Sequence, residues 1–500
     1  MKRTEELFSL IHTLDKAEKR FFKLSASIEG GEKQYMRIFD IVARQSEYDE
    51  KEILSELRIS KNLLAFQKNY LQRLILNHIA FLHSTRRNNA QFLLTQAEIL
   101  KNKGLYPQLS KLLQKLKEQA RESDMNHVLF EAAGMEHGLA WKDQRLDDAA
   151  AAISDKMKIV ELLKIETEYH ALANEVISTM VRLGDEKKPE MVRVLKKMVK
   201  HPLISNEKNA VSFRCKNYLY HMLSLYYSVA GDVQKQYVYA KKNAQLFLEP
   251  NRIKNFTMTH VFALHNLVGA CNAVRKYDEA QQNLDILLKS SKGLPSLRER
   301  LWVFFTFYDS SFEYYANTGQ FEKGIAFAEK HIPEINKYSH MLDSMQSIIL
   351  SFFIAKLYFG TGRYNHSIEW MNKIRQKEQE LWVRPGLEVN IKLFYIIVHY
   401  EKGNTDLLSY LSKSLHRHLK VKQRLYKLET VVLDFFGKKI QRANSKKELT
   451  EEFRKLKKEI LTLSKDAYES VPLKEFDYIS WIESKIENRP FAELVRERQR

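Results

Sequence analysis

The segment NTGQFEKGIAFAEKH, residues 317–331, carries the pattern that decides the fold of this 500-residue chain. A helix-breaking glycine is followed two residues later by the apolar side chain of Phe321 and, three residues further, by the small residue Gly324. Apolar residues then continue at helical spacing. GTGRYNHSIEWMNKI (360–374) and EKGNTDLLSYLSKSL (401–415) repeat this arrangement. Each segment therefore predicts a tight turn that reverses one helix onto the next.

The same turn recurs along most of the chain. Its predicted positions are residues 104, 144, 184, 231, 275, 319, 362 and 403, at intervals of 40 to 47 residues. Prolines fall in the other connections, where we expect each to end the second helix of a pair because proline cannot continue a helix. These prolines stand at positions 250, 295, 333 and 385. Turns within pairs and prolines between pairs are typical of a stacked array of helical hairpins.

The composition agrees with a helical chain. Glycine (16 residues) and proline (9 residues) are too scarce for the many tight turns of a β-sandwich, propeller or barrel of this length. The hydrophobic share of 44% and the aromatic share of 11% suffice for a packed core and exclude general disorder. The sequence therefore predicts an all-α protein.

The segment KYDEA, Lys276–Ala280, resembles the turn and second helix of the tetratricopeptide repeat (TPR) family. The period here is longer than the family's ~34 residues, and the aromatic start of the family's first helix is not retained. The resemblance implies a right-handed superhelical solenoid of TPR-like antiparallel helix pairs over residues 89–420. We expect helical caps at both ends, namely an N-terminal helical domain over 1–88 and a basic C-terminal helical cap over 421–500, with Trp481 in its core.

The sequence lacks the common catalytic and phosphate-binding motifs, which argues against an enzyme. The chain has no glycine-rich phosphate-binding loop, no His-Glu-x-x-His zinc motif and no Gly-x-Ser-x-Gly nucleophile elbow. Its two cysteines, Cys215 and Cys271, cannot build a four-thiolate zinc site, and neither has a convincing catalytic neighbour in sequence. His416 and His418 are two residues apart on a predicted helix and so point to different faces. We therefore expect no catalytic residue, no cofactor and no metal.

The TPR resemblance implies that residues of the first helix of each pair line a concave groove. The residues expected there are Tyr218, His221, His265, Asn266, Asn272, Asp309, Glu313 and Lys356. We expect a scaffold that binds a partner protein or peptide in this groove. The N-terminus lacks the apolar core of a signal peptide, and the most apolar stretch, 348–358, is too short to span a bilayer, so we expect a cytoplasmic location. The alternative is that the eight residues are ordinary exposed or packing residues.

Positive charge is concentrated near the C-terminal end. The chain has a net charge of +19, and residues 413–465 hold sixteen Lys and Arg against six acidic residues, a difference of +10. Such a stretch attracts polyanions such as nucleic acid, although a solvated helical face has the same composition. The candidate polyanion contacts are Lys420, Lys422, Arg424, Lys427, Lys438, Lys439, Arg442, Lys446 and Lys447.

One N-terminal segment offers a second function. YDEKEILSELRISKNLLAFQKNYLQRLI, residues 48–75, resembles a bacterial helix-turn-helix. Lys61, Lys68 and Arg73 could meet phosphate groups, whereas Arg58 stands where such turns favour glycine. The alternative function is a nucleic-acid-associated transcriptional regulator, in which this segment binds DNA and the TPR-like array senses a ligand. The other interpretation of the segment is a packed N-terminal helical cap.

Overall fold

The computed structural model describes residues 5–27, 33–86, 90–183, 189–248, 250–290, 294, 297–339, 341–377, 385–421, 427–465, 473 and 476–499. The regular structure in these ranges is helical, as predicted, and no strand occurs in them. The chain divides into two compact units, Met1–Leu163 and Lys164–Arg500, which are described separately below.

The first unit contains two helical clusters. It begins with α1 (Glu6–Thr13), α2 (Lys16–Ser27), α3 (Gln34–Arg44), α4 (Glu50–Leu57) and α5 (Lys61–Arg86). Their apolar faces meet in one core, in which Ile11, Phe22 and Phe39 are fully buried. Helices α6 (Ala90–Asn102), α7 (Tyr106–Glu122) and α8 (Asn126–Lys142) then pack around a second core of leucine and alanine side chains. The long helix α9 (Leu146–Leu183) begins in this unit and ends in the next.

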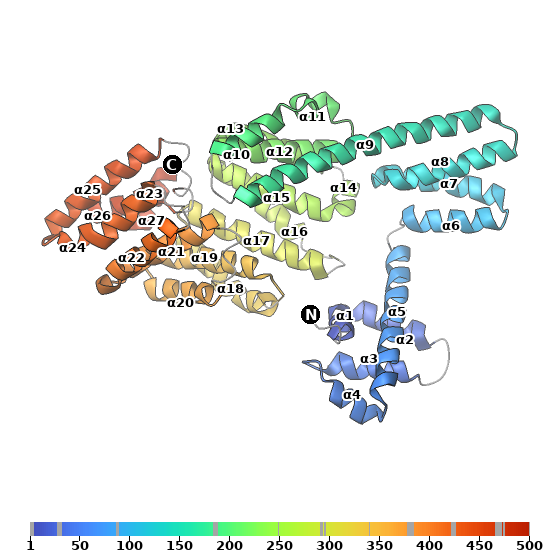
Figure 1. Ribbon diagram of the computed structural model, residues 1–500, viewed down its shortest axis with the longest axis horizontal. Helices are drawn as coiled ribbons and strands as arrows, with labels where there is room; N and C mark the ends of the chain where they lie inside the picture. Colours follow the sequence, from blue (N-terminus) through green and yellow to red (C-terminus); the bar gives the residue numbers. More distant parts are fainter. Residues whose placement is uncertain are drawn as a thin grey trace. The chain divides into compact units, whose positions relative to one another are not determined.

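The second unit is a succession of helical hairpins (Figure 1). After α10 (Pro189–Val199) and α11 (Pro202–Ser205), the described pairs are α12 (Phe213–Ala230) with α13 (Val233–Gln245), α15 (Thr257–Ala273) with α16 (Tyr277–Ser290), α17 (Leu297–Asn317) with α18 (Phe321–Ser339), α19 (Ser344–Gly360) with α20 (Tyr364–Arg375), and α21 (Pro385–Glu401) with α22 (Thr405–Val421). The short helix α14 (Pro250–Asn255) precedes α15. Each pair packs against the next pair in chain order, and the first helices α15, α17 and α19 contact one another in turn.

The turns within the hairpins share one geometry. The residue at each described turn position has a left-handed backbone, with φ of 69° at Gly104, 56° at Gln144, 81° at Gly231, 60° at Arg275, 67° at Gly319, 75° at Gly362 and 83° at Gly403. The next residue donates its N–H to the carbonyl five residues earlier, as Gln320 does to Tyr315 at 3.0 Å. This is the Schellman arrangement, which satisfies the last carbonyls of the first helix. The predicted turn positions are thus confirmed, except Gly184, which lies outside the described residues.

The prediction for the prolines was wrong where the structure describes them. Pro250 and Pro385 begin α14 and α21 instead of ending the preceding helices. Proline is tolerated in the first turn of a helix because the N–H that it lacks would have no acceptor there. Pro333 lies inside α18, which continues to Ser339. Pro295 lies outside the described residues.

The C-terminal helices complete the core of the second unit. A helical run consists of α23 (Lys427–Asp434), a π-helical turn (Phe435–Lys439) and α24 (Ile440–Arg442), and is followed by α25 (Lys446–Leu463), α26 (Tyr478–Glu487) and α27 (Phe491–Gln499). Trp481 of α26 is fully buried, as predicted, and its Nε1 donates a hydrogen bond of 2.7 Å to Glu401 of α21. Phe491 of α27 stacks on Phe321 with ring centroids 5.5 Å apart. Helices α26 and α27 therefore fold back onto the hairpins between α17 and α21.

Candidate functional site

Two of the residues predicted to line a groove, Tyr218 and His221, belong to a band of ring side chains that starts on α9 and continues over α12, α15 and α17. We call this band the aromatic row, and it consists of His170, Tyr218, His221, Phe262, Trp302 and Phe305. Tyr218 and His221 are three residues apart and so share one face of α12. The ring of His221 lies 5.2 Å from that of Phe262, which lies 6.4 Å from that of Trp302. The row thus crosses α12, α15 and α17 without a break.

The aromatic row is open to solvent. Phe262, at its centre, is 37% exposed although the rings of His221, His265 and Trp302 neighbour it. Tyr218, His221, Trp302 and Phe305 are half-buried. Core aromatic residues of the same helices, such as Phe307 and Phe312, are buried by comparison. The row is therefore an apolar surface that the described part of this chain leaves uncovered.

Polar groups follow the aromatic row along one side. The Nδ1 atom of His265 is 2.9 Å from the Ser310 hydroxyl and 4.0 Å from Oδ2 of Asp309. The amide nitrogen of Asn266 is 3.4 Å from Nδ1 of His221. Burial lowers the pKa of His221 to about 4, and burial lowers the pKa of His265 too, against the opposing effect of Glu313. His221 is therefore neutral at neutral pH and adds no charge to this surface.

Three of the predicted groove residues are not free to meet a partner. Asn272 and Asp309 are each only 8% exposed, because the helices beside them cover them. Lys356 of α19 lies over the rings of Phe352 and Phe353, at 4.9 and 4.6 Å. It also lines a cleft of about 230 Å³ whose other wall is formed by Phe476, Asp477, Phe491, Val495 and Arg498 of the C-terminal segment. Around α19 the chain therefore covers its own first helices.

The residues that sequence reasoning missed are Phe262 and Trp302 as members of the open surface, together with His170 and Phe305. Phe262 precedes His265 by three residues, and Trp302 precedes Phe305 by three. This helical spacing was the available signal, because residues three or four apart share a helix face. The sequence did not predict that these side chains are exposed to solvent, because aromatic residues in such a chain are more often part of the core.

The basic stretch is partly neutralised by its own acidic residues. Lys438 pairs with Asp434 at 2.6 Å, and Lys439 pairs with Glu459 at 3.2 Å. Of the other predicted polyanion contacts, Lys420, Lys427, Arg442, Lys446 and Lys447 are exposed, and Lys422 and Arg424 lie outside the described residues. An open cleft of about 540 Å³ is lined by Lys413, His416 and Arg417, together with the paired Lys438 and Asp434.

The N-terminal segment 48–75 forms a helix, a turn and a second helix. Arg58 ends α4 with a left-handed φ of 50°, and α5 begins three residues later. Lys68 is tied to the fold, because its Nζ lies 2.7 Å from the Tyr48 hydroxyl and 3.6 Å from Glu50. Lys61 and Arg73 are exposed. Two of the three predicted phosphate contacts therefore remain accessible.

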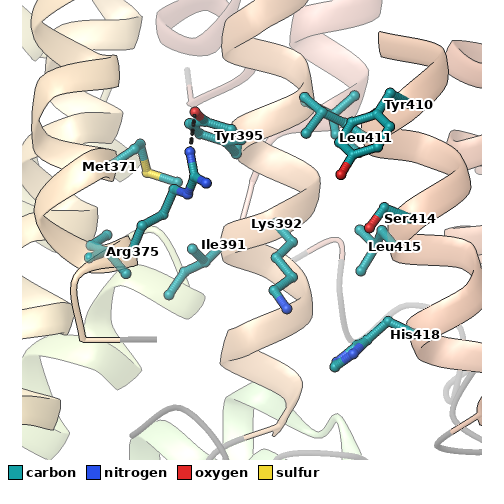
Figure 2. A pocket seen from close by; sticks show the side chains of 12 residues that line it. Met371, Arg375, Ile391, Lys392, Tyr395, Tyr410, Leu411, Ser414, Leu415 and His418 are labelled. Carbon is teal, nitrogen blue, oxygen red and sulfur yellow. Dashed lines mark hydrogen bonds between the residues drawn. The ribbon is translucent and has the colours of Figure 1, made fainter. Parts of the chain in front are cut away.

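A separate cavity of about 260 Å³ lies among α20, α21 and α22 (Figure 2). Figure 2 shows Met371 and Arg375 reaching it from α20, Ile391, Lys392 and Tyr395 from α21, and Tyr410, Leu411, Ser414, Leu415 and His418 from α22. The Arg375 guanidinium donates a hydrogen bond of 3.2 Å to the Tyr395 hydroxyl. Glu388, which is buried, accepts from Lys392 at 2.8 Å and lies 2.9 Å from Nε2 of His418.

The described parts of both units contain no group of three or more His, Cys, Asp or Glu side chains placed to hold a metal ion. Both cysteines are buried free thiols, and burial raises the pKa of Cys271 to about 12, which keeps it protonated. Within the same ranges, every helix is too short or too polar to cross a membrane.

No family model matches the chain, and no curated protein matches it.

Proposed function

We propose that the chain is a cytoplasmic, non-catalytic scaffold that binds a partner protein or peptide across the first helices of a TPR-like array. The observation that carries this proposal is the aromatic row, a solvent-open band of rings on three consecutive first helices. Aromatic side chains supply a large contact area with few rotatable bonds, and they dominate the binding energy of many protein interfaces.

The order of packing supports an array of the TPR type. Hairpin follows hairpin in chain order, and the turns within them have left-handed residues at the positions that the repeat pattern marks. In a right-handed superhelix of such pairs, the first helices line one continuous surface on which a partner segment docks. Two buried, reduced thiols are consistent with a cytoplasmic location.

The chemistry of the row favours one kind of partner segment. The neutral imidazole of His221 and the rings of Phe262 and Trp302 match apolar side chains, while Glu313 places a carboxylate near His265, one helical turn after Phe262. A helix or extended segment with aromatic or aliphatic anchors and one basic side chain complements this surface.

Affinity capture from the native host, followed by mass spectrometry, tests the proposal. Phe262→Glu places a charge at the centre of the row, and its 37% exposure lets the fold tolerate the change. Trp141→Glu is the matched control, since Trp141 is an aromatic residue of the first unit that is 58% exposed. We expect the unchanged chain and the control to retain the same partner, and Phe262→Glu to bind it at least about tenfold more weakly. Equal retention of all partners by Phe262→Glu would refute the proposal.

A second candidate function is nucleic-acid binding through α4 and α5. The observation that favours it is the left-handed Arg58 between two helices, with Lys61 and Arg73 exposed on the second. An electrophoretic shift assay with a salt titration tests it, because each phosphate contact steepens the dependence of affinity on salt. A double substitution of Lys61 and Arg73 to glutamate should abolish any shift. Absence of binding by the unchanged chain at low salt would exclude this function.

A further inference from the structure

The cavity among α20, α21 and α22 has the size and lining of a small-molecule site. Its volume of about 260 Å³ exceeds the roughly 150 Å³ of an engineered protein cavity that takes up benzene. Most of its wall is apolar, from Met371, Ile374, Ile391, Ile396, Leu411 and Leu415. Such a wall with a few polar groups is the usual form of a ligand pocket. The cavity therefore has room for one ring or branched chain together with one polar group.

One positive charge at this cavity is left without a carboxylate. Arg375 is exposed; it donates to the Tyr395 hydroxyl and lies over the Tyr395 ring, with 5.5 Å to the centroid. It makes no ion pair within the part of the chain that the structure describes. The lysine of the lining, Lys392, is already matched by the buried Glu388 at 2.8 Å. A guanidinium that faces a cavity without a counter-ion is suited to a carboxylate, which it can bind through two parallel hydrogen bonds.

Hydroxyl groups extend the polar part of the wall. Tyr395, Tyr410 and Ser414 all line the cavity, and Figure 2 shows Tyr410 and Ser414 on α22, opposite the Arg375 side chain of α20. Tyr410 is 66% exposed, so it stands at the mouth. A ligand entering past Tyr410 would meet Arg375 with its charged end and the leucine and isoleucine side chains with its apolar body.

We propose that this cavity binds a small monocarboxylate with an apolar body, the carboxylate on Arg375 and the body against Ile391, Leu411 and Leu415. The site lies on other helices than the aromatic row and does not depend on the scaffold function. The carboxylate can belong to a free organic acid or to the C-terminal residue of a peptide, because both present the same group beside an apolar side chain.

Ligand-observed NMR with the full chain tests this proposal. Phenylacetate represents a free acid and N-acetylphenylalanine a peptide C-terminus, while phenylacetamide keeps the ring and lacks the charge. For ligands of this size we expect at least one of the two acids to bind with a Kd of about 1 mM, and the amide at least about tenfold more weakly. The tighter of the two acids identifies the source of the carboxylate. Equal binding of amide and acid, or no binding of either acid, would overturn the proposal.

Three variants localise the binding to the cavity. Arg375→Met keeps the length of the side chain and removes its charge, so the bound acid should lose about tenfold or more in affinity. Lys373→Met is the matched control, because Lys373 lies on the same helix but over the Trp370 ring, outside the cavity lining. Ser414→Trp fills the mouth from an exposed position and should abolish binding of both acids. Unchanged binding by Arg375→Met and Ser414→Trp would show that the acids bind elsewhere, and the proposal would fall.

Discussion

Replacing Gly403 by alanine tests the turn geometry that organises the hairpins. Gly403 has a φ of 83°, and the following residue, Asn404, donates its N–H to the His399 carbonyl at 3.0 Å. A Cβ atom built at Gly403 would have no heavy atom within 4 Å, so the substitution introduces no clash with the surroundings. The remaining effect is the cost of a left-handed backbone for an L-residue, about 1–2 kcal/mol, which the lower freedom of alanine in the unfolded chain offsets by about 0.4–1 kcal/mol. We therefore expect Gly403→Ala to lower the free energy of unfolding by up to about 1.5 kcal/mol.

Two further substitutions separate backbone strain from packing. Gly319 has a φ of 67°, and a Cβ there would also lie 3.1 Å from Cγ1 of Val495 in α27. Gly319→Ala should therefore destabilise the chain more than Gly403→Ala, by about 2–4 kcal/mol in all. Arg275→Gly relieves the cost of holding an L-residue at a φ of 60°, which raises the free energy of unfolding. The greater freedom of glycine in the unfolded chain offsets part of this increase. We expect this variant to be neutral or more stable by up to about 1 kcal/mol.

Urea denaturation followed by circular dichroism at 222 nm measures these differences. Gly269→Ala is the control, because Gly269 lies within α15 and a Cβ there would also have no heavy atom within 4 Å. Alanine is favoured over glycine inside a helix by about 1 kcal/mol, so the control should gain stability. If Gly403→Ala gains stability as Gly269→Ala does, the turn does not depend on its left-handed residue and the reasoning is refuted.

Two other predictions concern the core and the pH dependence of stability. Trp481→Phe replaces the indole by a smaller aromatic ring and removes the 2.7 Å hydrogen bond to Glu401. It should lower the free energy of unfolding in urea by at least about 1.5–3 kcal/mol, the cost of a lost hydrogen bond to a charged group. A loss no greater than that of a surface variant would contradict the role of this bond. His260 is 5% exposed, and burial lowers its pKa from 6.5 to about 4. Between these two pH values the folded chain therefore binds fewer protons than the unfolded chain. The free energy of unfolding should fall as the pH drops from 6.5 to 4, by about 3 kcal/mol from this residue. His260→Gln should flatten the pH dependence of the urea midpoint in that window, and an unchanged slope would show that His260 is not its source.

The helical architecture followed from local signals in the sequence. A left-handed turn depends only on its own residue and on the hydrogen bonds of the helix before it. Gly319, Gly362 and Gly403 therefore indicated the positions of their turns directly in the sequence. Asp124 forms the same turn, with a φ of 55°, and was missed because an aspartate carries a weaker signal than a glycine. The prolines were misplaced because proline is compatible with either side of a helix boundary.

The candidate sites depend on contacts that no local pattern encodes. Asp309 has the helical spacing of a surface residue relative to Trp302, yet neighbouring helices bury it. Lys356 shares its cleft with Phe476, Asp477 and residues of α27, which come from a segment more than a hundred residues further along the chain. The cavity at Arg375 is formed by three helices together, and only their packing leaves it open. Exposure and enclosure are therefore properties of the assembled helices, which spacing alone does not determine.

Site-specific photo-crosslinking in the native host tests most directly whether the aromatic row is the partner surface. The chain would carry benzoylphenylalanine in place of Phe262 and, in a parallel sample, in place of Trp141, so that both probes are aromatic and stand at exposed positions. Our account predicts a covalent adduct with a discrete partner protein at position 262 and none at position 141. The same adducts at both positions, or an adduct at position 141 alone, would contradict it.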